Sequence, residues 1–156
     1  MKHYRCYLDT SVLNFALADN IQEKQYITLK YLYEIEYGGC DGFISELVLQ
    51  EINRAPENKR DRLIEVINKI KLKSLEGGSL VDDLAGKYIN AGLIPKKYED
   101  DAIHIAIAVI NQLDIVVSWN MEHMVKLKTR LGVNVINRLN GHREIEICTP
   151  EEVLGL

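Results

Sequence analysis

Segments with the pattern of strands alternate with segments with the pattern of helices along the whole chain, and this alternation constrains the fold more than any other feature. Short apolar runs typical of strands lie at residues 4–8, 42–44, 72–75, 115–118, 133–136 and 144–148. Apolar residues at helical spacing fill residues 11–17, 23–37, 46–52, 56–70, 79–92, 98–113 and 120–131. This order predicts an α/β domain in which helices cover both faces of a largely parallel sheet.

Polar residues and glycine mark where several of these helices begin and end. Ser45 and Ser79 are predicted to cap the helices that follow them, because a serine hydroxyl accepts a hydrogen bond from a free N–H of the first turn. Gly132 is predicted to stop the helix at 120–131. The run TPEE at residues 149–152 has the form of a capping box with proline at the first helical position, which predicts a short C-terminal helix.

Size and composition indicate one soluble domain over residues 1–156. No apolar run approaches the roughly 18 residues of a membrane span, and the first residues lack the apolar core of a signal peptide. Cys6, Cys40 and Cys148 show no close pairing and no metal-type spacing. We therefore expect a cytoplasmic protein with reduced thiols and no membrane association.

The net charge of −4 gives the chain no overall basic field. This charge argues against a general nucleic-acid binder that works by neutralising phosphates. It is compatible with a nuclease whose acidic site is neutralised by a metal ion. Small clusters of Lys and Arg, at residues 54–62, 71–73, 96–97 and 126–130, are more typical of solvated helix faces than of a binding strip.

Three acidic residues stand where a parallel sheet would bring them to one edge. Asp9 follows the first strand, Glu51 lies late on an otherwise apolar helix, and Asp101 begins the apolar run that ends at Ala108. Sites in such folds form outside the carboxyl ends of the strands. A carboxylate on so apolar a helix is expected to be partly buried, and it then needs hydrogen bonds, a cation or a proton.

Each of these residues also has a purely structural interpretation. Asp9 could cap the turn that follows it, and Glu51 could pair with Arg54. Asp101 lies in a first helical turn, where the helix dipole favours negative charge. His104, three residues later, is more typical of a hydrogen-bonded core histidine than of a ligand. The set of acids therefore carries more weight than any one of them.

Four blocks of the sequence resemble the PIN-domain family, in its VapC-type and related prokaryotic members, in order and spacing. They are YLDTSV at 7–12, ISELVLQEI at 44–52, DAIHIA at 101–106 and VSWN at 117–120. The resemblance runs from residue 4 to at least residue 125. It implies a three-layer α/β/α fold with a largely parallel sheet of four to five strands.

The resemblance implies a metal-dependent endoribonuclease with Asp9, Glu51 and Asp101 as metal ligands. Ser11 and Ser118 match hydroxyl positions that orient ligands or water in such sites. Asn120 stands where many members have an aspartate, although a variant with asparagine and a following histidine, here His123, occurs in some branches. Oxygen ligands suit Mg²⁺ or Mn²⁺, and a bound ion would activate water for attack on an RNA phosphodiester.

The resemblance also implies a homodimer and leaves open that the chain is the toxin of a type II toxin–antitoxin pair with a cognate antitoxin. A different interpretation keeps the fold without the catalysis, as a module that binds RNA or protein and is weakened or inactivated by Asn120. Other chemistries fit less well, because the chain has no P-loop and no Gly-x-Ser-x-Gly motif. The run DTS at 9–11 also lacks the second aspartate of the aspartyl phosphatases.

Overall fold

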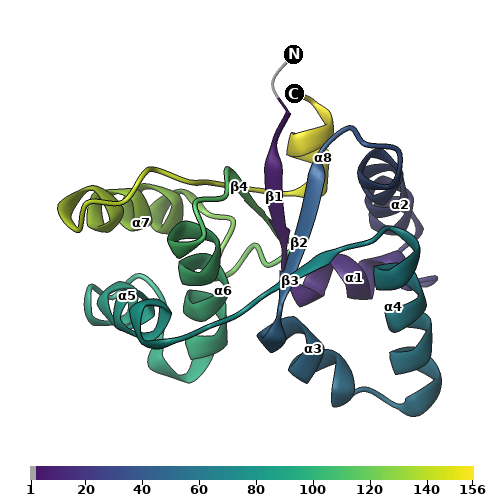
Figure 1. The fold of residues 1–156 in the computed structure, drawn as a ribbon, viewed down its shortest axis with the longest axis horizontal. Helices are drawn as coiled ribbons and strands as arrows, with labels where there is room; N and C mark the ends of the chain where they lie inside the picture. Colours follow the sequence, from purple (N-terminus) through teal and green to yellow (C-terminus); the bar gives the residue numbers. More distant parts are fainter. Residues whose placement is uncertain (1–2) are drawn as a thin grey trace.

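A five-stranded parallel sheet forms the centre of the computed structural model, which describes residues 3–156 (Figure 1). The strands are β1 (Arg5–Leu8), β2 (Asp41–Ser45), β3 (Lys73–Leu75), β4 (Ile115–Val117) and β5 (Glu146–Cys148). Their order in the sheet is β3-β2-β1-β4-β5, and every neighbouring pair is parallel. Because β1 is central, the residue that follows it lies between the ends of β2 and β4.

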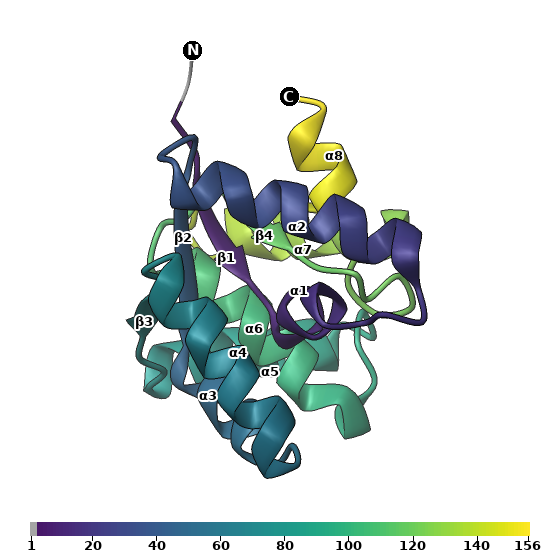
Figure 2. The same ribbon diagram turned by 90° about the vertical axis from the view of Figure 1, so that its right-hand side faces the viewer.

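Helices cover both faces of this sheet, as Figures 1 and 2 show. The helices are α1 (Thr10–Ala16), α2 (Gln22–Glu36), α3 (Glu46–Asn53), α4 (Glu57–Lys69), α5 (Ser79–Asn90), α6 (Glu99–Ile110), α7 (Leu127–Leu139) and α8 (Pro150–Leu154), and the 3₁₀ turn η1 (Lys96–Tyr98) precedes α6. Helices α1, α2 and α4 lie on one side, and α5, α6 and α7 on the other. The predicted three-layer α/β/α architecture is confirmed.

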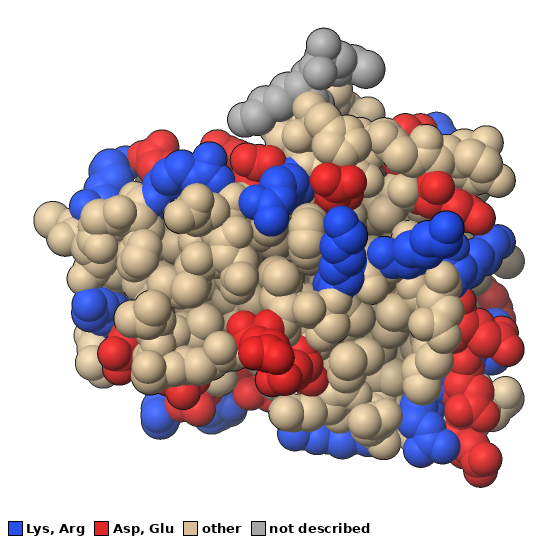
Figure 3. All heavy atoms as spheres, in the orientation of Figure 1, with Lys and Arg blue, Asp and Glu red and all other residues tan. Residues whose placement is uncertain are grey.

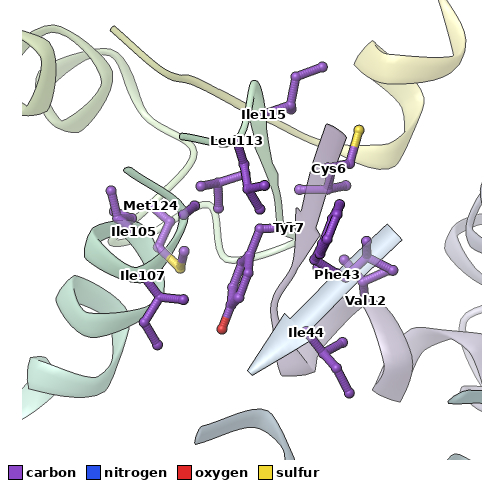
Figure 4. Close-up of a cluster of buried hydrophobic side chains, with 14 of the residues drawn as sticks. Cys6, Tyr7, Val12, Phe43, Ile44, Ile105, Ile107, Leu113, Ile115 and Met124 are labelled. Carbon is purple, nitrogen blue, oxygen red and sulfur yellow. The ribbon is translucent and has the colours of Figure 1, made fainter. Parts of the chain in front are cut away.

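The core is built around β1, β4 and α6. Cys6, Tyr7 and Leu8 of β1 are fully buried, and α6 is buried on almost every side because α5 covers its outer face. In Figure 4, Tyr7 points toward α6, while Cys6 lies on the other side of β1. This alternation follows from the strand, in which successive side chains point to opposite faces of the sheet.

Two of the predicted helix caps are confirmed and one is wrong. The Ser45 hydroxyl accepts from the N–H of Val48 at 3.4 Å and begins α3. Thr149 forms the predicted capping box with Glu152 at the start of α8. Ser79 is instead the first residue of α5, and the cap position is Gly78, whose φ of 134° strongly favours glycine.

The predicted helix at 120–131 and strand at 133–136 are also wrong. Residues 121–126 form turns, and a single helix, α7, covers the end of the first predicted segment and all of the second. Gly132 lies inside this helix, at a position where a Cβ would come within 2.3 Å of the Leu93 side chain. It therefore permits a close helix contact and does not end the helix, an effect that the local sequence does not reveal.

Charged side chains of both signs share the surface, and the thiols are unpaired. On the face drawn in Figure 3, basic side chains are interspersed with acidic ones and form no continuous band. The three cysteines are free thiols. No helix within residues 3–156 is long and apolar enough to cross a membrane.

Candidate functional site

Asp9 ends the central strand and uses both of its carboxylate oxygens. Oδ1 accepts from the N–H of Val12 at 3.3 Å and from the Ser11 hydroxyl at 2.5 Å, so the expected cap of α1 is formed. Oδ2 accepts from the hydroxyl of Ser118 at 2.5 Å, which reaches it from the end of the neighbouring β4. The side chain is only 4% exposed, so Asp9 caps a helix and also ties two strand ends together.

The loop after β4 closes one side of the site. Its backbone is held by hydroxyls, because Trp119 N–H donates to Ser11 at 2.9 Å and Asn120 N–H donates to Ser118 at 2.9 Å. The Asn120 carbonyl oxygen Oδ1 accepts from the N–H of His123 at 3.0 Å, and the Asn120 side chain acts to lower the pKa of Asp101. Asn120 therefore sits within the acidic site.

Glu51 reaches the site from α3 and is held by two side chains. Its Oε1 accepts from the Thr10 hydroxyl at 3.1 Å and lies 2.6 Å from Nε2 of His104. The sequence allowed an ion pair between Glu51 and Arg54, but the described residues 3–156 contain none. Glu51 pairs with His104 instead. The structural alternative for Glu51 is therefore replaced by a contact with α6.

His104 is also held from its other side. Its Nδ1 lies 2.6 Å from the hydroxyl of Tyr7, which is in turn 2.7 Å from the hydroxyl of Ser45. His104 is thus a buried, hydrogen-bonded histidine, as its apolar helix indicated, but its partner is one of the predicted ligands. His104 thus joins α6 to β1 and α3, and Tyr7 extends the contact to β2.

Asp101 faces the site from the first turn of α6. Its Oδ2 lies 3.3 Å from Nδ1 of His123, whose ring packs on that of Tyr98 with 4.0 Å between ring centroids. The Asp101 side chain remains 20% exposed. Asp101 is therefore partly open to solvent, as Glu51 is, while Asp9 is almost completely buried.

The charges of these groups are coupled through His104. Burial raises the pKa of Asp9 and of Asp101 above the usual range, although the charge of His104 and hydrogen bonds act in the opposite direction. Burial also acts to raise the pKa of Glu51, but the hydrogen bond and charge of His104 outweigh it and hold that pKa below its usual range. The site is thus an acidic cluster with little positive charge.

The pKa of His104 itself reflects this acidic surrounding. Burial lowers it, but the hydrogen bond to Glu51 and the negative charges of Asp9, Glu51 and Asp101 outweigh burial and leave it above its ordinary value. One imidazole therefore faces all three acids that the sequence singled out.

The predicted ligands are close neighbours but do not form a closed ligand set as their side chains stand. Within residues 3–156, no three acidic, histidine or cysteine side chains are grouped tightly enough to hold a metal ion. Each acid is instead held by its own neighbours, Asp9 by Ser11 and Ser118, Glu51 by Thr10 and His104, and Asp101 by His123. Their chemistry fits a hard divalent cation, since carboxylate and amide oxygens are the ligands that Mg²⁺ and Mn²⁺ prefer.

Sequence analysis gave no role in the site to Tyr7 or Thr10, and it treated His104 as a core residue. Tyr7 could have been found, because it stands two residues before Asp9 and strand residues at that spacing share a face. His104 stands three residues after Asp101, which places the two on one side of a helix. Their hydrogen bonds with Ser45 and Glu51 depend on how the elements pack.

Comparison with known proteins identifies the family and the fold. The family model described as "PIN domain" matches residues 6–120. The fold is similar to that in the structure of VapBC2 from Rickettsia felis bound to a DNA fragment from their promoter, with a TM-score of 0.55 and 11% identity over 92% of this chain and 97% of that chain. It is also similar to DNA-bound VapBC from Salmonella typhimurium, with a TM-score of 0.50 and 16% identity over 94% and 98% of the two chains. None of the curated proteins compared with it matches. Because the family model covers well over half of the sequence, the chain belongs to the PIN-domain family.

Proposed function

We propose that this protein is a metal-dependent endoribonuclease that hydrolyses RNA phosphodiester bonds. One observation carries the proposal: the buried Asp9 and the half-buried Asp101 lie together at the carboxyl edge of the parallel sheet, and burial raises the pKa of both despite the opposing charge of His104. A site of this kind gains stability when a cation enters. Membership of a nuclease family supports the same conclusion.

Asp9, Asp101 and Glu51 would hold the ion, Mg²⁺ or Mn²⁺, and the amide oxygen of Asn120 could complete the set. When bound, such an ion lowers the pKa of a coordinated water and offsets the charge of a phosphate. Both hydrogen bonds of Glu51 fall on its Oε1, so Oε2 would be the oxygen that meets the ion, whereas the Asn120 side chain would have to turn because its Oδ1 accepts from His123 N–H. The expected products carry a 5′-phosphate and a 3′-hydroxyl.

The hydroxyls of Ser11 and Ser118 would orient Asp9. Each donates to a different carboxylate oxygen, at 2.5 Å. The backbone N–H groups of Trp119 and Asn120 fix these hydroxyls in turn. The carboxylate is thereby held in one rotamer, which favours a site preorganised for the ion.

The first experiment is calorimetric titration of Mn²⁺ and Mg²⁺ into metal-free protein, together with Asp9→Asn and Asp101→Asn. We expect saturable binding by the wild type and a large loss in both variants, with their far-UV circular dichroism unchanged. Metal-dependent cleavage of single-stranded and structured RNA should disappear in the same variants. Cleavage that survives both substitutions would show that the activity resides elsewhere.

A specific observation favours the alternative, a PIN-fold module with little or no catalysis. Asn120 supplies no charge, and its Oδ1 is already used by the N–H of His123. If this residue limits the site, Asn120→Asp should tighten Mn²⁺ binding and raise the cleavage rate. If instead the wild type binds no ion in the millimolar range and the variant does, the non-catalytic module is the better description.

We further propose an antitoxin partner and a cytoplasmic site of action. Both structures compared above are VapBC complexes, which makes a cognate antitoxin reasonable for this chain. Expression of the wild type without a partner should arrest growth, whereas Asp9→Asn should be tolerated.

The proposed homodimer is checked by sedimentation equilibrium of the purified chain.

A further inference from the structure

A continuous row of hydrogen-bonded side chains leads from the sheet to Glu51. It runs from Ser45 at the end of β2 through Tyr7 of β1 and His104 of α6 to the carboxylate, with separations of 2.7, 2.6 and 2.6 Å. The first three members are almost completely buried. Figure 4 shows the Tyr7 hydroxyl placed between α6 and the end of β2, where these partners meet it.

The donors of this row all point toward Glu51 when His104 is neutral. The Ser45 oxygen accepts from Val48 N–H, which leaves its own proton free to donate to Tyr7. Tyr7 then donates to Nδ1 of His104, and the proton on Nε2 is donated to the carboxylate of Glu51. If His104 carries a charge, Tyr7 accepts from Nδ1–H and donates to Ser45. Nε2–H faces Glu51 in both forms, so the contact does not depend on the protonation of the ring.

Glu51 needs such support more than the other acids do. It is a long side chain near the end of α3 and is 25% exposed, whereas Asp9 is short and is held on both oxygens. An unsupported glutamate loses more rotamer freedom when it is fixed, which weakens whatever it binds. His104 and Thr10 remove that freedom before any ligand arrives.

We propose that His104 is a positioning residue that holds the carboxylate of Glu51 in place for the metal ion, and that Tyr7 and Ser45 fix the plane of its ring. This inference rests on the proposed metal-dependent function. A residue that only filled the core would affect folding and would leave the affinity for the ion unchanged. A positioning residue acts on that affinity, and it does so through Glu51.

Two substitutions at His104 test the contribution of Nε2 separately from that of Nδ1. His104→Gln keeps an amide N–H near the place of Nε2. His104→Asn keeps one near Nδ1 and leaves Glu51 with the hydroxyl of Thr10 but without a donor from α6. We expect His104→Asn to weaken Mn²⁺ binding by about 10–100-fold, the range seen when residues behind metal ligands are removed. His104→Gln should restore most of the affinity, and Tyr7→Phe should give a smaller loss.

The decisive measurement is a double-mutant cycle with Glu51→Ala, read as the Mn²⁺ dissociation constant from calorimetry. If His104 acts through Glu51, His104→Asn causes no further loss once Glu51 is alanine. Equal losses in both backgrounds would overturn the inference, as would wild-type affinity in His104→Asn. Thermal melting of the metal-free variants shows whether each is folded. If His104→Asn does not fold, the Mn²⁺ affinity of Tyr7→Phe tests the inference in its place.

Failure of the inference and failure of the proposed function give different results. Wild-type protein that binds no Mn²⁺ contradicts the function, and with it the role of His104. Wild-type protein that binds Mn²⁺ and loses it in Asp9→Asn, but not in His104→Asn, keeps the function and rejects only the positioning role.

Discussion

Asp9 is the residue at which folding and proposed chemistry conflict. Its carboxylate caps α1 and bridges to Ser118, and these contacts stabilise the fold. Its negative charge is nevertheless buried, and burial raises its pKa. For a carboxyl group with a raised pKa, the folded state is favoured at low pH, and this contribution is lost as the pH rises through the folded pKa. Without a metal ion, the charge therefore destabilises the protein at neutral pH.

Replacing Asp9 by Asn should raise the stability of the metal-free protein. Asparagine caps helices as well as aspartate does and carries no charge to bury. We expect an increase in the melting temperature of about 2–4 °C at pH 7, the shift typical of 1 kcal/mol in a chain of this size. The difference should shrink as the pH falls through the raised pKa of the wild-type carboxyl, which then takes up its proton.

Thermal melts in the presence of a chelator measure this effect, and melts with Mn²⁺ provide the control. The ion should raise the melting temperature of the wild type and leave that of Asp9→Asn almost unchanged. A variant that melts lower than the wild type at every pH would show that the hydrogen bonds of Asp9 outweigh the burial of its charge.

At the residue scale, the sequence could predict neighbours in the chain and at strand ends but not contacts across the core. Ser11 lies two residues from Asp9, and a parallel sheet brings the turn at Ser118 to the same edge, although the pairing of their two strands was not predicted. The contact of Tyr7 with His104 joins residues 97 positions apart. It depends on how closely α6 packs on β1, which no local pattern specifies.

At the scale of elements, caps that use local hydrogen bonds were predictable and the bounds of α7 were not. The Thr149 cap is formed by residues within one helical turn. The start of α7 depends on the turn made by Asn120, whose carbonyl accepts from the N–H groups of Met124 and Val125. Its continuation through Gly132 depends on Leu93. A glycine that ends a helix and a glycine that permits close packing look the same in a sequence.

The two helical glycines therefore make a matched test. Gly132→Ala in α7 should destabilise the protein by about 1–3 kcal/mol, because the new Cβ would lie 2.3 Å from the Leu93 side chain. Gly86→Ala in α5 should stabilise it by about 0.5–1 kcal/mol, because nothing lies within 4 Å of its Cβ position and alanine favours helix. Urea unfolding of both variants measures the difference, and equal effects would contradict the close contact of α7 with Leu93.

At the scale of the whole molecule, the alternation of elements predicted the layers and the parallel strands but not the strand order. Order matters because β1 lies in the middle, with β2 and β3 on one side and β4 and β5 on the other. Only this arrangement places Asp9 between Ser45 and Ser118. The family model ends at residue 120. Beyond it, β5 extends the same sheet, and α8 packs against β5 and α2.

A central β1 shared by both halves leads us to expect that residues 1–156 unfold as one domain. The single tryptophan, Trp119, is well suited to test this, because it follows β4 and its indole N–H donates to Thr28 of α2 at 2.8 Å, across the end of β1. Its fluorescence therefore reports contact between the two halves, while far-UV circular dichroism reports all the helices. The two signals should give one urea midpoint, as they do for a cooperative domain. An earlier tryptophan transition would mean that the β4–β5 side separates while the helices persist, and the site, which draws Asp9 and Asp101 from both sides of that boundary, would then be lost before the fold.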